Sequence, residues 1–334
     1  MKDKHKIIAA AFAGLCIVAI TFVMAFNHSS IGFTSDNNTV KKEVLFLAKA
    51  TDSEFWKSVC AGASVASAEY NLEMRFEGPE NEEDYATQNN MIYSAIEDGV
   101  DAIVFSAVDY ELNAEAIDKA AMAGIKIVAV DSEVDSKYVQ YYIGTDNYEA
   151  GCMAGENALS MEEGQLNIGI VNFDSKTENG QSREKGFRDV VLEDERVNIV
   201  SSINVKSSTE DARIKTIEML KQCPEINVIV TFNEWTSLGV GEAVDELNLG
   251  EDIHVIAFDS NVRSVGMLEE GIVDALVVQN PYAMGYLGIE KAFELLNDQH
   301  LPQEKVISTS SMLVTRENMY DEECQRVLFA FDEN

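Results

Sequence analysis

The chain has 334 residues, and its 58 acidic and 25 basic side chains give a formal net charge of -33. Its length suggests about two domains, and its 46% hydrophobic content can fill a substantial core. Because so acidic a surface repels phosphate backbones and anionic bilayers, nucleic acid is excluded as a partner. Any membrane contact must come from a dedicated segment.

The beginning of the chain contains such a segment. Residues 7–26 carry no charged side chain and follow a short basic head, and about twenty apolar residues can cross a bilayer as a helix. We predict that residues 1–26 are a signal peptide, with a weak cleavage site at 23–25, or an uncleaved membrane anchor. Either alternative exports the remainder to the extracytoplasmic face of the membrane. Residues 27–40 are polar and read as a linker.

Beyond residue 40, short apolar runs alternate with amphipathic stretches of helical length. This pattern predicts parallel sheets covered by helices on both faces, and about ten strands favour two sheets over one. The fold class is therefore α/β, with two doubly wound parallel-sheet lobes. The predicted strands are 44–50, 102–108, 126–131, 166–172, 228–233, 253–259 and 275–280, with weaker ones at 73–77, 141–144 and 198–205, and the clearest helices are 54–70, 82–98 and 234–247.

Polar and aromatic side chains gather where these strands end, which is where ligands bind in such folds. Each alone has a simpler explanation as a helix cap. Together they suit a neutral polyhydroxylated ligand, because carboxylates and amides pair with hydroxyl groups and aromatic rings cover the apolar face of a sugar. The residues are Lys49, Ser53, Phe55, Trp56, Ser106, Asp131, Asn233, Asp259 and Gln279.

Eight short stretches have an order and spacing that are specific when taken together: 49–56, 99–104, 123–131, 143–151, 183–187, 231–234, 257–260 and 278–281. They resemble the type I periplasmic sugar-binding proteins, the ribose-binding-like solute receptors of ABC transporters. The resemblance covers nearly the whole chain after residue 40. It implies two lobes joined by a three-strand hinge, with crossings near Thr145, Gln279 and Ser308. The first lobe would hold 41–144 plus 280–308, and the second 145–279 plus 309–334.

The resemblance also implies roles for individual residues. Phe55 and Trp56 match the aromatics that sandwich the sugar, and Asp131 matches the first-lobe carboxylate that binds hydroxyls. A further group matches ligands of the second lobe and hinge: Arg183, Asn233, Asp259 and Gln279.

The chain departs from the ribose binders at several of these positions. Ser53 and Ser106 stand where those proteins often have asparagine, and Ser132 stands where they have arginine. Lys49 resembles the lysine of arabinose-type binders and would restore the positive charge that Ser132 lacks. These departures predict a ligand other than ribose.

The predicted function is a monomeric binding protein that closes over a monosaccharide and delivers it to an ABC permease, with no cofactor. An alternative partner is a membrane sensor, either a histidine kinase or a chemoreceptor. An alternative ligand is a sugar acid or another solute, held by Lys49 and Arg183. Catalysis is not expected, because the dinucleotide, phosphate-loop, nucleophile-elbow and zinc-protease motifs are absent from the sequence.

Two further expectations concern charge and cysteine. The excess negative charge is assigned to solvated helix faces at 82–84, 193–195 and 321–323. Cys60 and Cys152 are interpreted as small buried side chains, and Cys223 and Cys324 complete a set whose spacing fits no zinc site. A disulfide among the four stays open.

Overall fold

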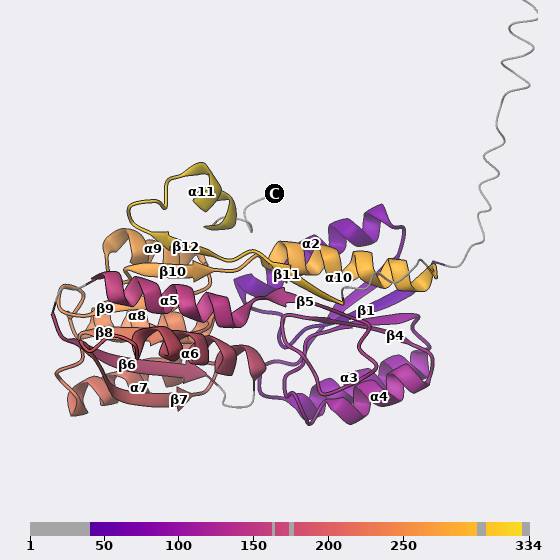
Figure 1. Cartoon of the computed structure of the whole chain (residues 1–334). Coiled ribbons are helices and arrows are strands. Elements are labelled where there is room, and N and C mark those ends of the chain that lie inside the picture. The colour runs from indigo at the N-terminus through magenta and orange to yellow at the C-terminus, as the bar shows by residue number, and fades with distance from the viewer. Residues whose placement is uncertain (1–40, 162–163, 174–176, 299–304, 329–334) are drawn as a thin grey trace, which may run out of the picture. The chain divides into compact units, whose positions relative to one another are not determined.

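The computed structural model describes residues 41–161, 164–173, 177–298 and 305–328, and their strands form two six-stranded sheets (Figure 1). The first sheet has the order β11-β5-β4-β3-β1-β2 and the second β12-β10-β9-β8-β6-β7. All neighbours run parallel except β10 and β12. The strands of the first sheet are β1 (Glu43–Leu47), β2 (Glu73–Glu77), β3 (Ala102–Phe105), β4 (Lys126–Val130), β5 (Tyr141–Thr145) and β11 (Val306–Thr309). Those of the second are β6 (Leu166–Phe173), β7 (Val197–Val205), β8 (Val228–Thr231), β9 (His254–Phe258), β10 (Ala275–Val278) and β12 (Met312–Thr315).

Helices cover both faces of each sheet. The first lobe consists of the first sheet with α2 (Glu54–Glu69), α3 (Tyr85–Asp98), α4 (Ala114–Met122) and α10 (Pro281–Leu296). The second lobe consists of the second sheet with α5 (Asn147–Met161), α6 (Glu178–Val191), α7 (Thr209–Gln222), α8 (Glu234–Glu246) and α9 (Val262–Glu270). The short α11 (Glu322–Leu328) follows β12.

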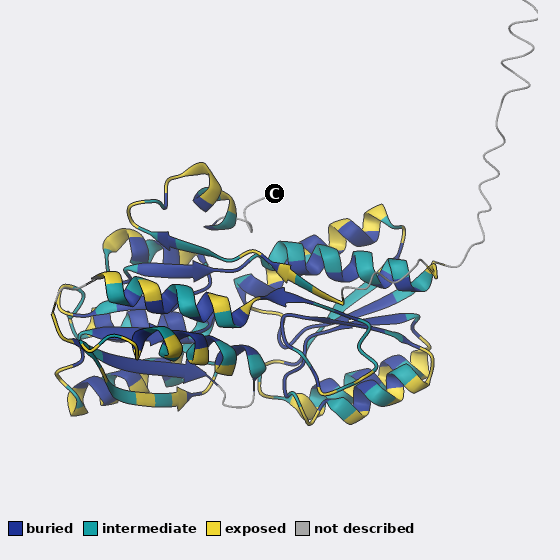
Figure 2. Ribbon diagram, in the orientation of Figure 1, coloured by how far each residue is buried: buried dark blue, intermediate teal, exposed yellow. Residues whose placement is uncertain are grey.

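The central strands are buried on both sides, which explains why their sequences read as unbroken apolar runs. In β1, Val44 and Phe46 pack toward α2 and α10, whereas Leu45 and Leu47 pack toward α3 and α4. Side chains alternate between the faces of a strand, so a strand enclosed by helices needs apolar residues at every position. Figure 2 shows the buried strands inside and the exposed residues on the outward helix surfaces.

The chain passes between the two sheets three times. It leaves the first sheet after Thr145, returns after Val278 and leaves again between β11 and β12. On the return, α10 packs closely on α2, because Gly62 and Gly285 leave room for the backbone of the opposing helix. Helix α10 therefore follows β10 of the second sheet in sequence but belongs to the first lobe. The lobes are interleaved in sequence.

The sequence-based expectations fail at several places. The strands β11 and β12 were not among the ten predicted, and α3 begins at Tyr85, capped by Asp84, rather than at residue 82. Six predicted strands end one to three residues early, so the site residues expected at their ends lie in loops: Lys49, Ser106, Asp131, Asn233, Asp259 and Gln279. The strand predicted at 44–50 actually ends at Leu47. Its apolar pattern continues further because Ala48 and Ala50 are buried although they lie outside the strand.

The cysteine and membrane predictions have different outcomes. The four cysteines of the described part are free thiols, and only Cys324 is buried. The interpretation of Cys60 and Cys152 as buried is wrong, since both are partly exposed on helix surfaces. The predicted membrane segment and linker, residues 1–40, lie outside the described residues. Among the helices that are described, none is both long and apolar enough to cross a membrane.

Candidate functional site

A cavity lies where the carboxyl ends of the two sheets meet. It encloses about 330 Å³ of empty space, open solvent included. Every predicted site residue except Ser106 lines it. The lining residues are Lys49, Ser53, Phe55, Trp56, Glu82, Asp131, Phe173, Asn179, Arg183, Asn233, Glu234, Trp235, Asp259 and Gln279.

In the first lobe, Lys49 and Asp131 form a buried ion pair. Lys49 Nζ lies 3.2 Å from Asp131 Oδ2 and donates to Ser132 Oγ at 2.9 Å. Ser106, which does not line the cavity, donates to the same carboxylate oxygen at 3.3 Å. Burial raises the pKa of Asp131, but the charges of Lys49 and Arg183 outweigh it and leave the pKa below its ordinary value. Asp131 is thus an ionised acceptor beside a lysine ammonium.

The two lobes offer matching carboxylates. Asp131 follows β4 and Asp259 follows β9, and their φ angles of 60° and 67° lie in the left-handed region. The two backbone N–H groups donate to neighbouring strands, to Ile143 O at 2.9 Å and to Val277 O at 3.0 Å. Such a backbone is strained for most side chains but tolerated by aspartate, and it concentrates at functional sites. Each sheet therefore presents one carboxylate from an equivalent position.

Arg183, on α6, makes three hydrogen bonds, two within the second lobe and one at the crossing that follows β10. Its Nε donates to Asn147 Oδ1 at 2.9 Å, and its Nη1 and Nη2 donate to Phe232 O and Gln279 Oε1 at 2.7 Å each. The guanidinium also lies over the Phe258 ring, 5.0 Å from its centroid. A guanidinium has five N–H groups, so these contacts leave two with which it can bind a ligand.

Gln279 orients the second carboxylate. Its Nε2 donates to Asp259 Oδ1 at 2.6 Å, while its Oε1 accepts from Thr145 Oγ1 and Arg183, both at 2.7 Å. Burial raises the pKa of Asp259 to about 6, although the Arg183 charge and the Gln279 hydrogen bond oppose the rise. Because its amide is already engaged at both ends, Gln279 fits a role in positioning Asp259 and Arg183.

Asn233 lines the cavity from the second lobe, and Phe55 and Trp56 line it from the first. Asn233 caps α8: its Oδ1 accepts from Thr236 N at 3.0 Å, and its Nδ2 donates to Ser207 Oγ at 2.7 Å. Phe55 and Trp56 meet edge to face at the start of α2, with ring centroids 5.1 Å apart. Ser53 caps that helix by accepting from Trp56 N at 3.1 Å. The helix caps therefore fix the backbone positions from which these side chains reach the cavity.

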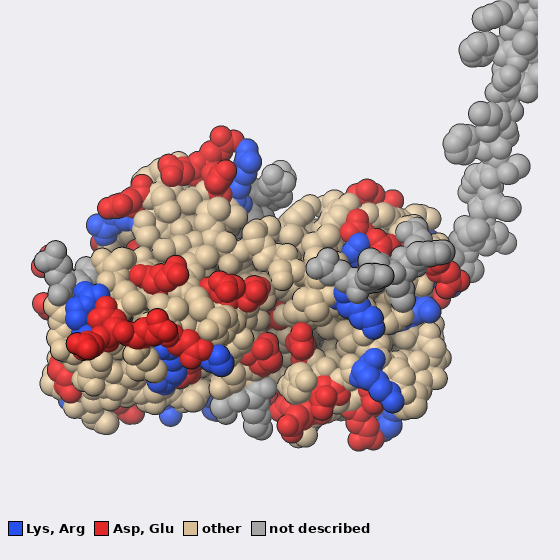
Figure 3. Space-filling model, in the orientation of Figure 1, with Lys and Arg blue, Asp and Glu red and all other residues tan. Residues whose placement is uncertain are grey.

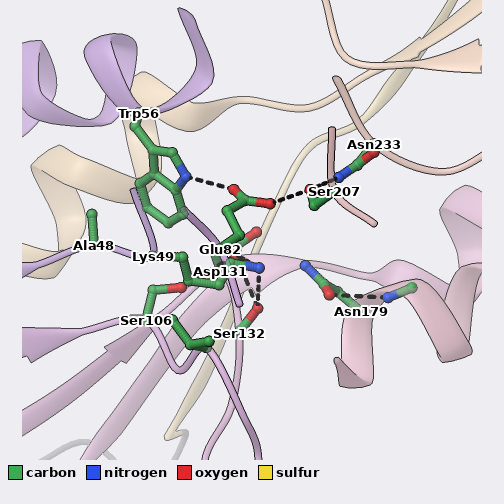
Figure 4. Close-up of polar contacts among 12 residues, drawn as sticks. Ala48, Lys49, Trp56, Glu82, Ser106, Asp131, Ser132, Asn179, Ser207 and Asn233 are labelled. Atoms are coloured by element: carbon green, nitrogen blue, oxygen red, sulfur yellow. Dashed lines mark hydrogen bonds and ion pairs between the residues drawn. The ribbon is translucent and has the colours of Figure 1, made fainter. Parts of the chain in front are cut away.

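Five lining residues were missed by the sequence reasoning. Assigning Glu82 to a solvated helix face is wrong, because it lies in the loop before α3 and its carboxylate reaches the cavity. Figure 4 shows it between Trp56 and Ser207. By contrast, the acidic residues at 321–323 are exposed, and Figure 3 shows carboxylates spread over the outer surface. The missed residues are Glu82, Phe173, Asn179, Glu234 and Trp235.

Glu234 makes a contact between the lobes. It is the first residue of α8, and its two carboxylate oxygens accept from Glu54 N at 3.3 Å and Phe55 N at 3.2 Å, the first N–H groups of α2. A carboxylate at a helix N-terminus is favourable. Nevertheless, burial, reinforced by the charge of Asp259, raises the pKa of Glu234 to about 7.

This raised pKa predicts a pH-dependent stability. An exposed glutamate has a pKa near 4.5, whereas folded Glu234 has a pKa of about 7, so protonation favours the folded state. That contribution is fully present below the unfolded pKa and is lost as the pH rises through about 7. We expect the melting temperature to rise as the pH falls from about 8 to about 6, and the Glu234→Gln variant to show a smaller rise.

Thermal denaturation at a series of pH values measures the difference. Glu242→Gln is the matched control, because Glu242 lies on the same helix but is 24% exposed and paired with Arg263. It should keep the pH dependence of the wild type. Equal pH dependence in the wild type and Glu234→Gln would contradict the assignment of a raised pKa to Glu234.

The comparisons with known proteins agree on one family. Residues 44–300 match the model of the periplasmic binding protein domain. A curated relative, the D-ribose/D-allose-binding protein of Pseudomonas aeruginosa PAO1, is 27% identical over 82% of this chain and 89% of its own length.

Solved structures are similar over most of their length. An ABC transporter solute-binding protein from Agrobacterium vitis with bound D-fucose has a TM-score of 0.82 and 29% identity, covering 86% of this chain and 99% of its own. A sugar transporter from Clostridium phytofermentans has a TM-score of 0.74 and 31% identity, covering 83% and 99%.

Proposed function

This chain belongs to the periplasmic binding protein family, and from that premise we propose that it binds a neutral monosaccharide between its lobes. The observation that carries the proposal is the pair of buried carboxylates, Asp131 and Asp259, presented by different sheets into one cavity. Carboxylates accept from the adjacent hydroxyl groups of a sugar, and Arg183 can donate to its oxygens. A relative named for ribose and allose, and a similar solved structure with bound D-fucose, support this class of ligand.

The binding mechanism follows from the division of the site. Lys49, Asp131 and Trp56 belong to the first lobe, and Arg183 and Asp259 to the second, so neither half alone surrounds a ligand. A sugar that contacts both halves has a higher affinity for the closed state and shifts the hinge equilibrium toward it. Closure also removes water, which strengthens hydrogen bonds to charged groups.

The charges around the cavity favour a neutral sugar over a sugar acid. Two basic side chains line it, and Lys49 is already paired with Asp131. Glu82, Glu234 and Asp259 add further carboxylates to the wall. An anionic ligand would therefore enter a cavity that already holds more acidic than basic groups.

The destination of the ligand completes the proposal. Residues 1–26 export the chain, as a cleaved signal or as an anchor, and the receptor works as a monomer on the extracytoplasmic face. It delivers the sugar to an ABC permease. The names of curated relatives include import binding proteins for ribose and fructose, which supports transport as the process served. No catalytic step and no cofactor are part of this function.

A thermal-shift screen tests the ligand class. The panel contains pentoses, hexoses, 6-deoxyhexoses, sugar acids, sugar alcohols, amino acids and nucleosides. A ligand that binds only the folded state at about a hundred times its Kd stabilises the protein by about 2.7 kcal/mol. We expect one or more neutral monosaccharides to raise the melting temperature. If only an amino acid, a nucleoside or a sugar acid does so, the proposed ligand class is wrong.

A further inference from the structure

The side chain of Glu82 spans the space between the lobes. It arises from the loop between β2 and α3 in the first lobe, and its Oε2 accepts a 2.7 Å hydrogen bond from Ser207 Oγ. Ser207 lies between β7 and α7 in the second lobe. The other carboxylate oxygen, Oε1, accepts from Trp56 Nε1 at 2.9 Å. One carboxylate thus binds donors from both lobes.

The contact is part of a longer chain of hydrogen bonds. Ser207 Oγ accepts from Asn233 Nδ2 at 2.7 Å, so four side chains are connected in the order Trp56, Glu82, Ser207 and Asn233 (Figure 4). Trp56 and Asn233 are buried and line the cavity from opposite lobes. The chain of hydrogen bonds therefore connects the two walls of the site directly.

These bonds join protein atoms to protein atoms, so their formation does not require a sugar. A hydrogen bond to a carboxylate is roughly twice as strong as one between neutral groups. We propose that Glu82 is a closure tie, whose bond to Ser207 holds the lobes together and populates the closed state of the receptor before a ligand binds. The proposal rests on the proposed function, because it assumes a receptor whose lobes open and close.

The tie has a consequence for ligand entry. A sugar enters only the open form, so a strong tie lowers the share of receptor that is ready to bind. The tie also positions Trp56 and Asn233 in advance, which reduces the ordering required on binding. Loss of one such bond should change the closed-to-open ratio by about tenfold, the effect expected of a single charge-assisted hydrogen bond.

Small-angle X-ray scattering without any sugar tests the tie. We expect Glu82→Ala and Ser207→Ala each to increase the radius of gyration above that of the wild type. The double variant should not exceed the larger single effect by much, because both substitutions remove the same contact. The matched control is Glu83→Ala, which removes a neighbouring exposed carboxylate and should scatter like the wild type.

The outcomes separate the tie from the proposed function. If both single variants scatter like the wild type, the tie is wrong, whatever sugar the protein binds. If they expand while no monosaccharide shifts the melting temperature, the tie is upheld and the proposed function fails. Circular dichroism confirms that the variants fold. If Glu82→Ala does not fold, Ser207→Ala decides alone, since it breaks the same bond from the opposite lobe.

Discussion

Replacing Asp259 with asparagine is expected to weaken monosaccharide binding by about thirtyfold or more. Removing one partner of a buried, hydrogen-bonded charge costs about 2–5 kcal/mol of binding free energy. Asparagine is the appropriate substitute because Asp259 has a φ of 67°, which asparagine tolerates and alanine does not. The variant keeps the size and backbone of the site, but it loses the charge and replaces one acceptor oxygen with an NH2 donor. Isothermal titration calorimetry with the best sugar of the thermal-shift screen measures the effect.

Asp298→Asn is the control for this substitution. Asp298 also has a positive φ, 49°, but it is exposed at the end of α10 and does not line the cavity. It should bind the sugar with the affinity of the wild type. If Asp259→Asn binds the sugar with the wild-type Kd, the Asp259 carboxylate does not contribute to sugar binding.

Arg183→Lys is expected to reduce both binding and stability. The guanidinium donates to Asn147, to the Phe232 carbonyl and to Gln279, and a lysine ammonium cannot reproduce this planar fork. Two of these acceptors would lose a charged donor, at about 1.5–3 kcal/mol each. We therefore expect the free energy of unfolding to fall by about 3 kcal/mol or more, measured by urea denaturation, and sugar affinity to fall with it.

Arg188→Lys is the control for this substitution, because it makes the same change at another arginine of α6. Arg188 is 31% exposed and pairs with Glu184, and exposed ion pairs contribute only about 0–1 kcal/mol. Its unfolding free energy and sugar affinity should stay close to those of the wild type. If Arg183→Lys is as stable as Arg188→Lys, the three hydrogen bonds of Arg183 do not stabilise this part of the fold.

Much of the fold could be predicted because its strands are enclosed. A strand with helices on both faces is apolar at every position, as in Val44 to Leu47, and this makes it visible in the sequence. The strands β11 and β12 lack this signature. They sit at the edges of the two sheets, and β11 is partly exposed and contains the polar Ser308 and Thr309. An edge strand at a crossing needs no continuous apolar run.

The site was predictable where topology alone brings residues together. Lys49 and Asp131 follow parallel strands of the first sheet, whose carboxyl ends share one edge, and Asp259 follows β9 of the second sheet. Trp235 could have been found by the same reasoning, because it follows a strand end and opens a helix as Trp56 does. Glu82 could not have been found in this way, because the acidic run in which it lies is typical of a solvated helix face. Its role depends on Ser207, 125 positions away.

The roles of individual residues also depend on contacts that no motif reveals. Gln279 matches a ligand position by resemblance, yet its amide is engaged by Thr145, Arg183 and Asp259. Lys49 was expected to replace a missing arginine at residue 132. Its ammonium lies 2.9 Å from Ser132 Oγ, so a positive charge stands beside that position. Both observations require distances between segments that are far apart in sequence.

Intrinsic fluorescence tests most directly whether a monosaccharide binds in this cavity. The chain has two tryptophans, Trp56 and Trp235, and both line the cavity, one from each lobe. A titration with the best sugar of the thermal-shift screen should therefore change the tryptophan emission, saturating at one sugar per chain. The change should require about thirtyfold more sugar in Asp259→Asn. Sugar binding that calorimetry detects, but that leaves the emission of both tryptophans unchanged, would contradict a site between the lobes.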